Sequence, residues 1–264
     1  MADLYNTVDS VNLLTAIGGA VGAGDRIFLI DSEQDYTSGT LSGAAAALLL
    51  VRSDFTGDIG SGGSAILVDL TSGTGTLDFN GGGAFAYFAP TTTIDLIVVR
   101  PDTPGVLKIT TGTVTEWAAA GGQNIVAAAA VVTTLSAVDC TVTIEDSATA
   151  ITLLTTDNAT ISTDRGASAV VCGARSTIVM ANYARNFATM DIWGTIDYRG
   201  GNSAGASTTI RPGGVLNLSK AGGNITFTAN IIGYPGGTLI LPRTGPTITY
   251  TLTPIGVGPT ILYQ

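Results

Sequence analysis

The chain has 264 residues, of which 45% are hydrophobic and 12% are charged, and its net charge at pH 7 is -9. Binding of nucleic acid needs a basic patch, so this acidic balance argues against nucleic acid as a partner. The longest apolar run, 43–51, ends at Arg52 and is too short to span a bilayer, so we expect no membrane partner either.

The N-terminal segment predicts a short helix followed by a strand. The apolar residues Val11, Leu13, Leu14 and Ile17 have helical spacing. Asp9 or Ser10 would cap the start of this helix, and Gly18-Gly19 would end it after about two turns. A Gly-Ala-Gly-Asp turn at 22–25 and a strand over 26–30 are expected to follow.

The stretch 15–36, TAIGGAVGAGDRIFLIDSEQDY, resembles the start of the pectin-lyase-like right-handed β-helix family. In that family a capping helix covers the open end of the solenoid, and a Gly-Asp-x-Ile-x-Leu strand begins the first coil. The resemblance implies an all-β fold, a right-handed parallel β-helix. We expect a capping helix and turn over 1–24 and the β-helix over 25–241, followed by an extended arm or cap over 242–264.

The first half of the chain repeats loosely. Strands are predicted at 28–30, 48–51, 66–68 and 97–99. The longest gap contains Gly81, Gly82, Gly83 and the aromatic residues Phe85, Tyr87 and Phe88, and it predicts a loop that leaves the coil. The Ala-rich segment 118–132 predicts a loop and a strand rather than a helix, because Gly121 and Gly122 interrupt it.

The second half carries a regular repeat. The dipeptide Thr-Ile recurs with its Ile at 144, 161, 178 and 196, in steps of 17, 17 and 18 residues. One coil of a small β-solenoid has about this length. Because side chains alternate along a strand, we expect Ile144, Ile161, Ile178 and Ile196 to form an inward ladder with the Thr residues outside. Small inward neighbours are expected two residues earlier, at Val142, Ala159, Ser176 and Gly194. A β-sandwich or a pair of β-domains is the alternative fold.

The C-terminal segment 242–264 contains Pro242, Pro246, Pro254 and Pro259 among alternating Thr and apolar residues. Proline cannot donate to a strand ladder, so this segment favours an edge strand, a terminal cap or an extended arm.

Residues for catalysis or metal binding are scarce. The chain has no His, which is the commonest general base and metal ligand. The best carboxylate group comprises Asp139, Glu145, Asp146, Asp157 and Asp164. Asp139 and Asp157 are 18 residues apart, and so are Asp146 and Asp164. The two members of each pair would therefore stack on adjacent coils. Such pairs share a cation, shift their pKa values or point into water. We expect them to point into water, and we expect no catalytic residue, metal or cofactor.

Two residue types have structural interpretations. Cys140 and Cys172 are 32 residues apart, close to two coils, which is too far for a disulfide, so two buried free thiols are expected. Trp117 and Trp193 are isolated in the sequence and are expected to pack at coil edges.

A β-helix with few charges, no secretory signal at residues 1–10 and no catalytic constellation resembles bacteriophage structural proteins. The resemblance implies a non-enzymatic virion protein, and we favour a capsid decoration (cement) protein over a tail spike. A glycan-binding or glycan-cleaving β-helix, such as a tail spike, is the alternative.

Solenoid flanks rich in Thr, Ser, Ala and Val solvate poorly, so we expect self-association as a homotrimer, bound to a capsid or other virion protein. The expected contact residues are Leu4, Tyr5, Val11, Leu14, Ile17, Pro242, Pro254, Ile261 and Tyr263.

Overall fold

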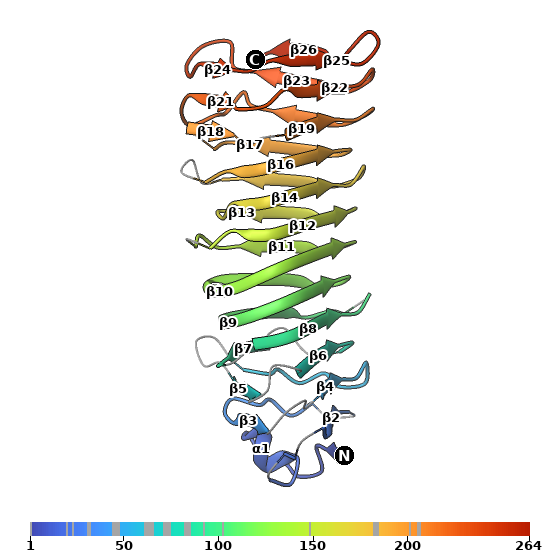
Figure 1. Cartoon of the computed structure of the whole chain (residues 1–264). Coiled ribbons are helices and arrows are strands. Elements are labelled where there is room, and N and C mark those ends of the chain that lie inside the picture. Colours follow the sequence, from blue (N-terminus) through green and yellow to red (C-terminus); the bar gives the residue numbers. More distant parts are fainter. Residues whose placement is uncertain are drawn as a thin grey trace. The chain divides into compact units, whose positions relative to one another are not determined.

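The computed structural model describes residues 2–19, 21–22, 24–30, 33–43, 48–60, 66–70, 75–81, 86–91, 93–101, 103–147, 149–181, 185–200, 202–204 and 207–264. The chain divides into two compact units, Met1–Thr141 and Val142–Gln264. Strands hold 55% of the chain and helix holds 2%, and the parallel strands stack in coils to form a β-solenoid of about 11 turns (Figure 1). The predicted parallel β-helix is therefore confirmed, and the sandwich alternative is wrong.

One ladder of the first unit takes one strand from each successive coil. Its strands are β1 (Asp3–Tyr5), β2 (Arg26–Leu29), β4 (Leu48–Val51), β6 (Gly75–Phe79), β8 (Thr93–Val99), and the later parts of β9 (Val106–Ala119) and β10 (Gln123–Val138). The register aligns a row of inward side chains, each at most 1% exposed: Ile27, Leu49, Leu77, Ile97, Trp117 and Leu135. This row is the centre of the core.

The second ladder of this unit contains β3 (Thr40–Gly43), β5 (Ile66–Leu70), β7 (Ala86–Pro90) and the early parts of β9 and β10. β9 pairs with β7 up to Ile109 and with β8 from Thr113, so one strand serves both ladders. Gly112 lies between the two parts with φ 91°. A Cβ at this position would collide with the Pro90 carbonyl oxygen, so only glycine fits the corner.

The N-terminal helix is shorter than the sequence predicted. Helix α1 (Leu13–Ala16) is a single turn, and its cap is Asn12, whose side chain accepts a hydrogen bond of 3.1 Å from the Thr15 N–H. The prediction of Asp9 or Ser10 as the cap was wrong, because Asn12 already provides the extended backbone and the acceptor. Gly18 and Gly19 end the helix with φ of 87° and 112°, as expected. Within the described residues, no helix is long and apolar enough to cross a membrane.

The described residues of the long gap in the first half stay within the coils. Its residues 86–90 form β7, which pairs with β5 and β9, and Phe88 is fully buried. The predicted loop residues Gly82, Gly83 and Phe85 lie outside the described residues. The Ala-rich segment forms β10 after Gly121 and Gly122, which confirms the prediction of a strand there.

The predicted Ile ladder lies in the second unit. Strands β13 (Thr160–Thr163), β15 (Thr177–Met180), β17 (Thr195–Tyr198), β20 (Val215–Asn217), β23 (Thr238–Leu241) and β26 (Thr260–Tyr263) pair in parallel, and β11 (Thr141–Ile144) pairs with β13. The register aligns Ile161, Ile178, Ile196, Leu216, Leu239 and Ile261, of which the first five are fully buried. Ile144 is 1% exposed, and the small neighbours Val142, Ala159, Ser176 and Gly194 are also buried.

A second ladder of this unit contains β12 (Ile151–Asp157), β14 (Ala167–Cys172), β16 (Phe187–Ile192), β19 (Ser207–Ile210), β22 (Ile231–Gly233) and β25 (Leu252–Pro254). A third, shorter ladder contains β18 (Asn202–Ala204), β21 (Ile225–Phe227) and β24 (Ile248–Thr249).

The C-terminal segment 242–264 is a further coil of the solenoid and not an extended arm. β25 pairs with β22, and β26 pairs with β23. Pro254 is tolerated because it is the last residue of its strand. Of the predicted alternatives, the pairing therefore supports an edge strand and not a separate arm.

Candidate functional site

Two of the five predicted carboxylates, Asp146 and Asp157, pair with arginines. Asp146 accepts a hydrogen bond of 2.7 Å from Nε of Arg185, and this bond holds the pKa of Asp146 below its ordinary value of 3.8. Asp157 lies 3.8 Å from Arg175 in a pair that is exposed on both sides. Asp146 is exposed, as expected for a carboxylate that points into water, and it is also paired with Arg185.

Arg165 is a buried charged residue that the sequence analysis did not single out. It follows β13, and only 1% of its surface is exposed. Burial lowers its pKa, whereas the charges of Asp146 and Glu145 raise it. The acidic pair therefore serves as counterions for a buried guanidinium. The sequence alone gives no sign of this, because Arg165 lies in a turn whose direction the strand pattern does not set.

Asp139 and Asp164 have local backbone roles. Asp139, between β10 and β11, has φ 50°, and Asn158, between β12 and β13, has the same φ. Asp and Asn tolerate this left-handed conformation better than other non-glycine residues do. The Asp164 N–H donates to the Ile144 carbonyl oxygen over 2.8 Å. Among the described residues, no group of three or more His, Cys, Asp or Glu side chains is placed to hold a metal ion.

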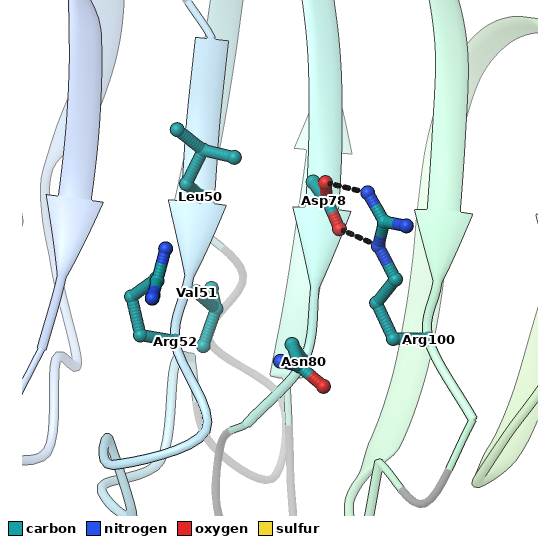
Figure 2. A pocket seen from close by; sticks show the side chains of 6 residues that line it. All are labelled: Leu50, Val51, Arg52, Asp78, Asn80 and Arg100. Atoms are coloured by element: carbon teal, nitrogen blue, oxygen red, sulfur yellow. Dashed lines mark hydrogen bonds and ion pairs between the residues drawn. The ribbon is translucent and has the colours of Figure 1, made fainter.

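A cavity of about 280 Å³ lies on the first unit. Its lining residues are Leu50, Val51, Arg52, Asp78, Asn80 and Arg100. Figure 2 shows Asp78 and Arg100 facing each other in a two-point ion pair, with hydrogen bonds of 2.8 and 2.7 Å, while Arg52 points away from that pair. Among the described lining residues, Asp78 is the single acidic one, so these residues do not include the two carboxylates that glycoside cleavage requires.

The cysteines and tryptophans occupy contrasting places. Cys140 and Cys172 are free and buried, as predicted, and burial raises the pKa of each thiol to about 11. Trp117 belongs to the core row and is fully buried, so its predicted place at a coil edge was wrong. Trp193 directly follows β16 and is 41% exposed. The Arg211 guanidinium carbon lies 5.3 Å from the ring centroids of both Trp193 and Tyr234.

The predicted N-terminal contact residues divide into exposed and buried ones. Tyr5 is 40% exposed and Val11 is 55% exposed. Leu4 and Leu14 are half-buried. Ile17 is only 4% exposed, so it belongs to the core and cannot contact a partner. Val8, 52% exposed, was missed because it lies outside the helical pattern.

The C-terminal coil also exposes apolar side chains. Of the predicted residues, Ile261 is 36% and Tyr263 is 58% exposed, Pro254 is exposed, and Pro242 is half-buried. Ile255, Val257 and Leu262 are also exposed but were not predicted. Beside them lies a cavity of about 200 Å³ lined by Leu241, Pro242, Pro246, Ile248, Tyr250 and Tyr263. We call the exposed residues of 254–263 the C-terminal face.

The charges of the chain are segregated along the sequence. All 20 acidic residues lie at or before Asp197, and the four charged residues after it, Arg199, Arg211, Lys220 and Arg243, are basic. Arg199 pairs with Asp197 and Arg211 pairs with Asp191, with N–O distances of 2.8 and 2.7 Å. Lys220 and Arg243 are exposed. The segment after Asp197 therefore carries basic side chains and no acidic ones.

Comparison of the chain with protein-family models, with curated proteins and with solved structures gives no match.

Proposed function

We propose that this chain is a non-enzymatic structural subunit of a larger protein assembly, in which its C-terminal face is covered by another protein chain. The observation that carries the proposal is the position of Ile261. It continues the register of the buried Ile ladder, yet it is 36% exposed. A side chain aligned with a core row, among five other exposed apolar residues, is typical of a surface that a partner covers.

The kind of assembly that we favour is a virion, with the chain as a capsid decoration protein and a homotrimer as its own association state. The scarcity of charges and the resemblance of the sequence to phage β-helices support this proposal. The ion-paired carboxylates support it as well, because Asp146 and Asp78 are engaged by arginines and do not form an acid–base pair.

Light scattering on the purified chain tests the association. We expect a mass of three copies at micromolar concentration. Tyr263→Glu should lower this mass, because it places a charge in the apolar face. The matched control is Val138→Glu, at a residue 37% exposed in the first unit, which should leave the mass unchanged. A wild-type monomer would contradict the proposal.

Binding to particles tests the virion assignment. Electron microscopy of the source material should locate the chain on intact particles, and Tyr263→Glu should reduce its co-sedimentation with them. Free protein that never co-sediments would contradict the virion assignment while leaving self-association intact.

Glycan binding is the second candidate, and the exposed Trp193 favours it. An exposed Trp ring has a flat apolar face and an N–H at its edge, so a ligand can cover part of the ring. The chain has two Trp residues and one of them, Trp117, is buried, so a glycan at Trp193 would change only the exposed component of the fluorescence. Titration with polysaccharide should shift this emission in the wild type and not in Trp193→Phe. No shift in the wild type would contradict glycan binding.

A further inference from the structure

From the distribution of charge and apolar surface, we infer that the partner of the C-terminal face is the N-terminal face of a second copy of this chain. The inference rests on the proposed self-association and identifies the two surfaces that meet. We define the N-terminal face as the exposed residues Tyr5, Val8, Asp9 and Val11.

Both faces expose apolar side chains of similar extent. On the N-terminal face, Tyr5, Val8 and Val11 are 40%, 52% and 55% exposed. On the C-terminal face, Ile255, Leu262 and Tyr263 are 42%, 42% and 58% exposed. Each face therefore gains by leaving water, and neither is blocked by a layer of charged side chains.

The charges on the two faces are opposite. The first 35 residues contain six acidic residues and one basic residue, Arg26, and this Arg26 is paired with Asp3 at 2.7 Å. Asp9 is exposed between Val8 and Val11. Arg243 is exposed and lies next to the C-terminal face, because its backbone N–H donates to the carbonyl oxygen of Gln264 over 2.6 Å, directly after β26. Asp9 and Arg243 are thus the charges that a contact between the two faces would bring together.

The alternative contacts between two copies pair like charges. Two C-terminal faces would bring Arg243 against Arg243, and two N-terminal faces would bring acidic residues together. Like charges at an interface cost several kcal/mol, whereas opposite charges set both the choice of partner and its orientation. Only the contact of unlike faces satisfies both the apolar and the charged side chains.

The backbone supports the same pairing. Among the described residues, β1 pairs with β2 and β26 pairs with β23, so each face also presents an outer strand edge. All of the described ladders are parallel. An outer edge of a strand is a template for pairing with another chain.

Charge reversal tests the inference. Arg243→Glu and Asp9→Lys should each raise the concentration needed for half-association by about tenfold or more, because each places like charges across the contact. The double variant should regain the wild-type value, since opposite charges face each other again. The matched control is Arg175→Glu, at an arginine whose side chain is 66% exposed and which belongs to neither face, and its association should equal that of the wild type.

Mixing the two single variants gives a second readout. The mixture contains one unaltered N-terminal face and one unaltered C-terminal face, so the two variants should associate with each other at concentrations at which neither associates alone. When Val8→Cys and Tyr263→Cys variants are mixed with a mild oxidant such as oxidised glutathione, a disulfide cross-link should form between them, while the native thiols stay buried. Circular dichroism melting curves establish that each variant is folded.

The outcomes separate this inference from the proposed function. If the wild type associates but neither reversal weakens association, the contact between unlike faces is wrong and self-association stands. The same conclusion follows if the double variant stays as weak as the single ones. If the wild type is a monomer at every concentration, both proposals are wrong.

Discussion

Arg165 places a guanidinium in the interior of the second unit, and the charge of Asp146 helps to keep it ionised there. Replacing Asp146 by Asn should lower the thermal unfolding midpoint at neutral pH, because Arg185 loses its ion pair and Arg165 loses a counterion. Circular dichroism melting curves measure this. Asp164→Asn is the control and should melt like the wild type, since the described contacts of Asp164 involve its backbone.

The stability that Asp146 contributes should depend on pH in a definite direction. The hydrogen bond from Arg185 depresses the pKa of Asp146 below 3.8 in the folded state. Its contribution to stability is therefore complete above pH 3.8 and is lost as the pH falls through the lower folded value. The difference in melting midpoint between the wild type and Asp146→Asn should shrink in strong acid. An equal difference at neutral and acid pH would contradict the role of Asp146 as a counterion.

The two thiols should be unreactive in the folded protein. Burial raises the pKa of Cys140 and Cys172 to about 11, so both are protonated at pH 8, and the thiolate is the reactive form. A colorimetric thiol reagent should modify neither residue in native buffer and both residues in denaturant. Fast modification of the native chain would show that the structure around one of the two thiols opens readily.

At the scale of the elements, the Ile ladder of the second unit should supply much of the stability of its coils. Ile178 is fully buried between Ile161 and Ile196 in the register. Ile178→Ala removes three carbons from a packed row and should cost about 2–5 kcal/mol. Denaturant unfolding measures this, and Val171→Ala, at a residue 37% exposed, is the control with a much smaller cost. A cost for Ile178→Ala as small as that of the control would contradict the packed ladder.

The ladder was predictable from the sequence because its repeat has one dominant signal. Each coil places Thr outside and Ile inside at nearly constant spacing, and strand alternation converts this spacing into a buried row. The structure of the long gap between predicted strands near Phe88 was not predictable in the same way. Glycines and aromatics indicate a loop by composition, but Phe88 is held in β7 by pairing with distant strands on both sides. Such long-range pairing overrides local propensity.

The candidate surfaces were only partly predictable. Exposed apolar residues at both termini follow from the poor solvation of the sequence, and Tyr5, Val11, Ile261 and Tyr263 are exposed. Ile17 was placed wrongly because helical spacing shows that one side of a helix is apolar but not what covers it. Ile255 and Val257 were missed because they lie in the turn between β25 and β26, where no alternation marks the outside.

At the scale of the whole molecule, the charged residues are distributed unevenly along the sequence, so its two ends differ in charge. The acidic residues end at Asp197, and the last 44 residues contain a single charged residue, Arg243. If copies meet through unlike faces, every open linear assembly has one N-terminal face uncovered at one end and one C-terminal face uncovered at the other. Such heterologous contacts either close into a ring or continue as a filament.

The net charge of each copy favours a closed ring of copies over a long open assembly. Each copy adds a charge of -9, so repulsion accumulates as copies are added, whereas a ring of three leaves no face exposed. We expect the light-scattering mass to rise with concentration and to reach a plateau at three copies. Added salt screens the long-range repulsion, so longer open assemblies should appear beside the ring at high ionic strength. A mass that rises without a plateau at low salt would show that the copies form filaments, and a plateau at two copies would show that they meet through like faces.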